Sequence, residues 1–137
     1  MALSNRDRIG KALDELRNAL KPFIIRQLNN HLGSGWEEQL HPNDKNLDDV
    51  SALLSLCMTY WPSVLKKHLS QSDRAYISEL KEARNKWAHS VSMSSDDVER
   101  YLDTAVRLCR NINAKDQSES IRNIKEELRQ QIYTERA

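Results

Sequence analysis

The chain has 137 residues, of which 39% are hydrophobic and 30% are charged, with only 3 glycines and 3 prolines. This length suits one domain with a sizeable core. The composition, together with a hydrophobic period of 3.6 residues, favours an all-α fold over a β or disordered one. The formal net charge of +1 excludes a global field that draws the protein to nucleic acid, so any RNA contact has to be local.

The cysteines and the hydropathy indicate the cellular setting. Cys57 and Cys109 fall on apolar helix faces without the spacing of a metal site or a redox motif, which favours buried, reduced thiols. No apolar run approaches the roughly 18 residues of a membrane span, and the N-terminus lacks the apolar stretch of a signal peptide. We therefore expect a soluble, cytoplasmic protein that does not contact a membrane.

The first helix is predicted over residues 5–32. Its apolar side chains recur every three or four residues, at Ile9, Leu13, Leu16, Leu20, Ile24, Leu28 and Leu32. Pro22 removes one backbone donor inside this helix and predicts a kink near Lys21 rather than two separate helices. Residues 33–45 are rich in turn-forming residues and are predicted to be a loop, in which Trp36 packs as a lid over one end of the bundle.

The second and third helices each follow a capping sequence. Asn46, with Asp49 three residues later, predicts the start of the second helix. The apolar stripe of that helix continues past Pro62, where we expect the chain to bend or to restart the helix. The third helix is predicted to start after residues 70–73 and to end near His89.

Two further helices complete the predicted fold. Ser94 or Ser95 caps the fourth helix, whose buried stripe comprises Val98, Leu102, Ala105, Cys109 and Ile112. The fifth helix, residues 117–136, has a narrow apolar stripe and balanced charges, which is typical of a helix that docks along one seam. We expect residues 1–114 to form a helical bundle, in an all-α chain of four to five helices. Residues 115–137 then dock on this bundle or lead to a further domain.

An unusual polar set ends the third helix. Asn85 and His89 lie one turn apart on the same face, whereas Arg84 is roughly 140° round from His89 and about 7.5 Å back along the axis. A straight helix therefore cannot aim Arg84 and His89 at one phosphate, so either the helix bends or a second copy supplies the missing group. Arg26 and His31 share this spacing, which makes the spacing alone a weak signal, and the set also fits a polar cluster that only caps the helix.

The surrounding residues resemble the HEPN superfamily (higher eukaryote and prokaryote nucleotide-binding). The resemblance rests on the run Ile77-Ser-Glu-Leu-Lys-Glu-Ala-Arg-Asn-Lys-Trp-Ala-His89, followed by Ser95-Asp-Asp and Leu102-Asp-Thr-Ala105. Leu20-Lys-Pro-Phe23 and the stretch from Leu53 to Trp61 extend it over roughly residues 5 to 114. The most similar branch is that of a eukaryotic mRNA quality-control endoribonuclease, which also occurs beside ATPase or helicase modules in bacterial defence proteins.

This resemblance implies an up-and-down helical bundle that forms a homodimer through the helix carrying Arg84 and His89. Active members of the superfamily are endoribonucleases that need no metal or other cofactor and build one site from two protomers. Arg84 is then expected to bind the scissile phosphate, Asn85 to orient the site, and His89 to perform acid–base chemistry at the ribose 2′-hydroxyl. Lys86 and Lys81 are the candidates for further RNA contacts.

One departure and one alternative limit this hypothesis. A toxin subgroup of the superfamily carries a tyrosine two residues after the motif histidine, where its antitoxin attaches nucleotides, and this chain has Val91 there. That regulation is therefore not expected here. The ribonuclease is expected to act in phage defence or RNA quality control. The alternative is a non-catalytic dimerisation or sensor module of a larger defence or RNA-processing protein with partner domains, and the near-zero net charge favours it.

Overall fold

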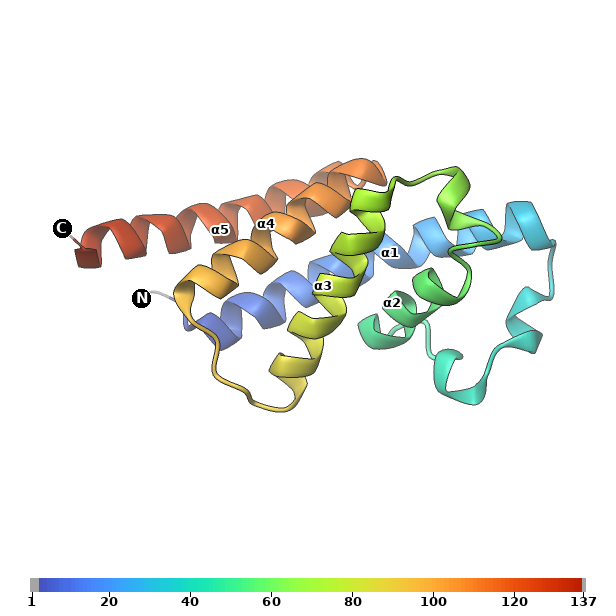
Figure 1. Cartoon of the computed structure of the whole chain (residues 1–137), viewed down its shortest axis with the longest axis horizontal. Coiled ribbons are helices and arrows are strands. Elements are labelled where there is room, and N and C mark those ends of the chain that lie inside the picture. Colours follow the sequence, from blue (N-terminus) through green and yellow to red (C-terminus); the bar gives the residue numbers. More distant parts are fainter. Residues whose placement is uncertain (1–2, 137) are drawn as a thin grey trace.

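The computed structural model describes residues 3–136, in which five α-helices pack as a bundle and no strand occurs (Figure 1). The helices are α1 (Asn5–Leu32), α2 (Val50–Thr59), α3 (Gln71–Ala88), α4 (Ser95–Asn111) and α5 (Lys115–Arg136). Three short 3₁₀ helices, η1 (Trp36–Gln39), η2 (Pro42–Asp44) and η3 (Leu65–Lys67), lie in the connections. The predicted all-α bundle is confirmed.

The long first helix, α1, passes behind α3 in Figure 1 and contributes the largest share of the core. It is capped by Ser4, whose hydroxyl accepts the backbone N–H of Asp7 at 3.0 Å. Pro22 lies inside α1 without dividing it, because a proline within a helix removes only one of its backbone donors. The predicted single helix is confirmed, and the kink near Lys21 stays a prediction.

The start of α2 differs from the sequence-based expectation. The N-cap is Asp49, whose carboxylate accepts the backbone N–H of Ser51 at 2.9 Å, so the prediction that Asn46 caps this helix was wrong. Asn46 instead accepts the backbone N–H of Asp48 at 3.1 Å, which closes a turn ahead of the helix. Past Tyr60 the chain turns at Pro62 and restarts only as η3, as the proline led us to expect.

The connection between α1 and α2 is held down by Trp36. This side chain is 2% exposed, and its indole N–H donates to the side-chain oxygen of Asn29 at 2.6 Å. Burial of a large aromatic ring with its one polar group satisfied is what a lid over the core requires. The predicted role of Trp36 is therefore confirmed, although η1 and η2 interrupt the predicted loop.

The remaining helices begin close to where the capping residues predicted. Ser70 and Asp73 form a reciprocal capping box at the start of α3, and Ser94 caps α4. α5 begins two residues before the predicted position 117 and packs antiparallel along α4 and against α1, burying Ile121 and Leu128 (Figure 1).

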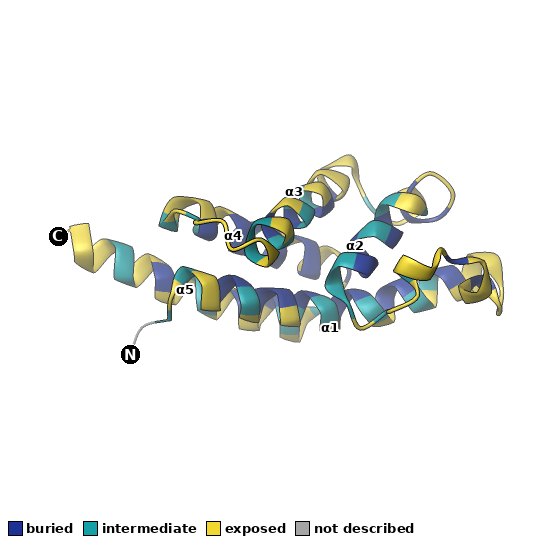
Figure 2. Ribbon diagram, turned by 90° about the horizontal axis from the view of Figure 1, so that it is seen from below, coloured by how far each residue is buried: buried dark blue, intermediate teal, exposed yellow. Residues whose placement is uncertain are grey.

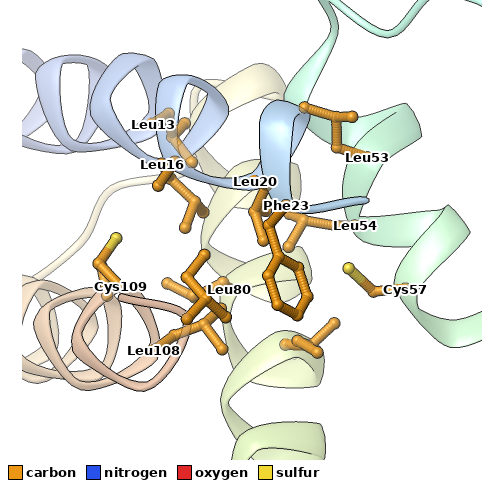
Figure 3. Close-up of a cluster of buried hydrophobic side chains, with 14 of the residues drawn as sticks. Leu13, Leu16, Leu20, Phe23, Leu53, Leu54, Cys57, Leu80, Leu108 and Cys109 are labelled. Atoms are coloured by element: carbon orange, nitrogen blue, oxygen red, sulfur yellow. The ribbon is translucent and has the colours of Figure 1, made fainter. Parts of the chain in front are cut away.

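One hydrophobic core joins all five helices (Figure 3). Cys57 of α2 and Cys109 of α4 are buried within it, and burial raises the pKa of both thiols to about 12. No helix within residues 3–136 has the length and apolar content needed to cross a membrane.

Candidate active site

The end of α3 that carries the predicted site residues closes in a Schellman-type turn. His89 is the C-cap residue, the backbone N–H of Ser90 donates to the Trp87 carbonyl at 3.3 Å, and that of Val91 donates to the Lys86 carbonyl at 2.9 Å. This turn requires a left-handed residue after the cap, and Ser90 adopts it with φ 55°. Glycine usually fills this position because other side chains are strained there. The backbone next to His89 is therefore strained.

The three predicted catalytic side chains lie at the surface of this helix end. Asn85 and His89 are exposed and Arg84 is half-buried (Figure 2 shows how burial varies along each helix). The backbone N–H of His89 donates to the Asn85 carbonyl at 3.0 Å, as helical spacing requires. Within residues 3–136, none of the three side chains forms an ion pair or a side-chain hydrogen bond. All three are therefore available to a ligand or to another protein surface.

Lys86 lies on a different side of α3. Its ammonium donates to the Tyr101 hydroxyl at 3.0 Å and pairs with Glu82 at 3.3 Å, in a polar groove of about 450 Å³ between α3 and α4. The hydrogen bond to Tyr101 and the pairing with Glu82 raise the pKa of Lys86. Residues two positions apart project from nearly opposite sides of a helix, so Lys86 points away from Arg84. Lys81, three residues before Arg84, shares its side of the helix.

The first turns of α1 support the end of α3, and the sequence alone did not suggest this. Arg6 donates to the Trp87 carbonyl at 2.7 Å, and its guanidinium lies 4.9 Å from the centre of the Trp87 ring. Gly10 lets this ring approach, because a side-chain carbon at position 10 would stand 3.2 Å from the indole nitrogen. A glycine inside a strong helical pattern was the one available signal of such close packing.

A small hollow of about 270 Å³ lies between the start of α1 and the loop that follows His89. Asn5 and Arg6 line it from α1, and residues 90–93 line it from the loop. Side-chain donors of Asn5 and Arg6 thus lie beside the candidate site, on the first turn of a neighbouring helix.

The second arginine–histidine pair with the same spacing is arranged differently. The Nε2 atoms of His31 and His68 are 2.8 Å apart, and the two imidazole rings meet edge to face at 5.0 Å. Arg26 lies 5.9 Å from the centre of the Phe23 ring. His31 is therefore occupied by a neighbour within the same chain, whereas His89 is not.

The side chains at the end of α3 are of types that can bind anions and transfer protons. A guanidinium binds phosphate oxygens with a permanent charge, and an imidazole exchanges protons near neutral pH. Among residues 3–136, no group of three or more His, Cys, Asp or Glu side chains is placed to share a metal ion. Since α3 is a single helix through Ala88, its geometry keeps Arg84 and His89 on different sides.

The fold is an all-α bundle of five helices over residues 3–136. Residues 11–113 match the model of the Swt1-like HEPN family, and the chain belongs to that family. HEPN domains generally bind RNA and dimerise, and many are ribonucleases. The matched segment ends before α5 begins. No curated protein and no solved structure gave a significant match to the chain.

Proposed function

We propose that this HEPN domain is a metal-independent endoribonuclease whose active site forms at the end of α3 from two copies of the chain. The observation that carries the proposal is the contrast along α3. Glu79, Glu82 and Lys86 are paired with neighbours, whereas Arg84 and His89 have no partner within residues 3–136. Polar side chains at a rigid helix end without internal partners suit a site that is completed by something else.

The proposed reaction needs only the groups that Arg84, Asn85 and His89 supply. Arg84 binds the non-bridging oxygens of the scissile phosphate, and His89 accepts the proton of the ribose 2′-hydroxyl as its oxygen attacks phosphorus. The bond from phosphorus to the 5′ oxygen breaks, and that oxygen takes a proton from an acid or from water. The products are a 2′,3′-cyclic phosphate and a 5′-hydroxyl. Asn85, one turn from His89, orients the imidazole or the substrate.

A two-fold axis beside α3 resolves the geometric difficulty within one chain. In a symmetric dimer, Arg84 of one protomer can face His89 of its partner, so the roughly 140° between them on one helix no longer matters. Lys81 lies on the same flank as Arg84 and is the nearer candidate for an additional phosphate contact. Lys86 contributes to RNA binding only when RNA competes with Glu82 and Tyr101 for its ammonium.

The test is cleavage of a mixed RNA pool by the purified protein in excess EDTA. We expect cleavage with cyclic-phosphate ends, and we expect Arg84→Ala and His89→Ala each to lower the rate by about 10²–10⁴-fold. Arg26→Ala and His31→Ala are matched controls, because they alter the same residue types at the same spacing on α1, and they should retain the wild-type rate. Cleavage that requires a divalent metal, or that survives both Arg84→Ala and His89→Ala, contradicts the proposal.

A second function is favoured by the charge of the protein. The net charge is +1, and Lys86, one of the few cations near the site, is already paired. These features suit a non-catalytic dimerisation or sensor module in a larger protein of antiviral defence or RNA quality control. A protein that dimerises but is inert toward RNA supports this alternative. RNA binding that weakens as salt rises supports the ribonuclease, because contacts to phosphates release counterions.

A further inference from the structure

A buried arginine links the two ends of the chain next to the candidate site. Arg8, in the second turn of α1, has a side chain that is 2% exposed. Its guanidinium donates to Glu127 at 3.0 Å and to Gln131, both on α5, and to the side-chain oxygen of Asn5 at 3.0 Å. Burying a charged group costs free energy even when it is paired, and the buried Nε of Arg8 has no partner. A hydrophobic residue at this position would contribute to packing at lower cost, which points to a role in fixing geometry.

Asn5 extends this hydrogen-bonded chain toward the site. Its side-chain oxygen accepts from Arg8, while its side-chain nitrogen donates to the backbone carbonyl of Met93 at 3.2 Å and to the Ser95 hydroxyl at 3.3 Å. The Asn5 amide therefore joins Arg8, which bonds to α5, to the loop between α3 and α4. The amide orientation is fixed by these neighbours, because the reverse orientation would place donors against the Arg8 guanidinium.

The loop that receives these bonds holds the backbone next to His89. Ser90, Val91 and Ser92 are exposed, Val91 at 49%, so within this loop the apolar packing comes from Met93, which lies partly buried against the core. Arg6 fixes its first end through the Trp87 carbonyl, and Asn5 fixes its second end. A segment with little apolar burial takes its position mainly from such bonds and opens locally when they are lost. The strained turn at Ser90 lies between the two anchors.

We propose that α5 positions His89 through the relay Glu127 and Gln131, Arg8, Asn5 and Met93. Arg8 and Asn5 are positioning residues, because they act on the backbone around His89 and not on substrate. The effect on cleavage rests on the ribonuclease function proposed above, whereas the effect on the position of His89 does not. α5 lies outside the segment that matches the family, so this relay connects the site to a helix that the family match does not cover.

The experiment follows the histidine ring signals by NMR in the full chain. The protein has four histidines, so the His89 signal is assignable by its loss in His89→Ala, and His31, His41 and His68 serve as internal references. Asn5→Ala removes the side chain of the relay that bonds to the loop after His89. Glu127→Ala combined with Gln131→Ala removes the two side chains of the relay that lie on α5. The matched control is Glu126→Ala combined with Gln130→Ala, which changes the same residue types one position earlier on the exposed side of α5.

We expect the variants at both ends of the relay to shift the His89 ring signal while the signals of the three reference histidines stay in place. Amide exchange in residues 90–94 should become about threefold to tenfold faster in both variants, as expected when one hydrogen bond is lost. The control variant should change neither measurement. In an active enzyme the substitutions at both ends of the relay should also lower kcat more than they change KM.

The proposal is overturned if the His89 signal and the exchange of residues 90–94 stay unchanged in the Glu127/Gln131 variant. It is also overturned if the Glu126/Gln130 control produces the same changes. These readouts do not require catalysis, so an inert protein would contradict the ribonuclease function without affecting the test of the relay.

Discussion

The chain carries an arginine and a histidine five residues apart at the ends of two helices, and the two ends differ in what surrounds them. At the end of α1, His31 meets His68 at 2.8 Å, and Arg26 lies against Phe23. At the end of α3, His89 and Arg84 have no side-chain partner within residues 3–136. The same spacing therefore serves an internal contact in one place and leaves its groups available in the other.

The two helix ends also differ in backbone chemistry. α1 closes with Gly33 at φ 78° and ψ 174°, a conformation that only glycine adopts easily. α3 closes with Ser90 at φ 55°, where a side chain is strained. Strain that persists beside unpaired polar groups is a feature of functional sites, because structure around it has to hold it in place. Side-chain partners, and not the spacing of arginine and histidine, distinguish the end of α3 from the end of α1.

Replacing the arginine at each helix end by lysine should affect RNA cleavage at only one of the two ends. Arg84→Lys should lower RNA cleavage by about tenfold to a hundredfold, because an ammonium cannot bind two phosphate oxygens as a planar guanidinium does. Arg26→Lys should leave cleavage unchanged, since Arg26 has no role in the proposed site. Initial rates in EDTA for both variants measure this difference. Equal losses in the two variants would remove the distinction between the two ends.

Both helix ends rest on one hydrophobic core. The protonation of the two thiols buried in this core shows whether the core is closed. The pKa of Cys57 and of Cys109 is about 12 in the folded protein, against 9.0 for a free thiol. Below pH 9 the thiols are protonated in both states and leave stability unaffected. Above pH 9 only the unfolded chain loses these protons, so stability falls, by about 1 kcal/mol per thiol near pH 10.

Denaturant titrations at pH 8 and pH 10 measure this loss, with Cys57→Ala and Cys109→Ala as references that lack one thiol each. Each substitution should reduce the pH dependence of the unfolding free energy. Thiols that react with iodoacetamide in the native protein at pH 8 as fast as in the unfolded chain would show that the core is open.

Substitutions of the left-handed residues at the ends of α1 and α3 should have opposite effects on the stability of the protein. Gly33→Ala should destabilise the protein by about 1–2 kcal/mol, because alanine is strained at the Gly33 backbone angles. Ser90→Gly should stabilise it by about 0.5–1 kcal/mol through relief of the left-handed serine, with reduced cleavage if the strained turn holds His89. Thermal or urea unfolding of the two variants gives both signs, and a destabilised Ser90→Gly variant would argue against strain at this turn.

The interaction energy between two side chains at the same helix end should be small. A double-mutant cycle of His31→Ala and His68→Ala should show a coupling of about 0.5 kcal/mol, the lower end for an exposed hydrogen bond. The cycle of Arg84→Ala and His89→Ala should show no coupling in monomer stability. Urea titrations of the four variants and the two double variants provide the numbers. Strong coupling between Arg84 and His89 in the monomer would mean that one chain already brings them together.

Much of the fold followed from local chemistry. The capping box of Ser70 and Asp73, the cap at Ser94 and the lid at Trp36 depend on residues close in sequence, and each was predictable. The cap of α2 was misassigned, because Asn46 and Asp49 both favour helix starts and only the turn through Asp48 decides between them.

The positions of the candidate site residues on α3 were predictable, but the contacts that support this end of the helix were not. Arg84, Asn85 and His89 stand in a local motif, so their positions on α3 follow from helical spacing alone. The bonds of Arg8 to α5 span more than 100 residues, and nothing local to Arg8 indicates them. Lys86 shows the same limit, because its pairing with Tyr101 depends on how α4 packs against α3.

In the proposed ribonuclease two copies of the chain build one active site, and this is tested by mixing two inactive variants. Arg84→Ala and His89→Ala protein are assayed separately and after subunit exchange, in EDTA, with RNA as substrate. A site shared between protomers predicts that the mixture recovers roughly a quarter of the wild-type rate, since half of the dimers are mixed and each holds one intact site of two. A mixture that stays inactive, although mixed dimers have formed and the wild type cleaves RNA, would contradict the account.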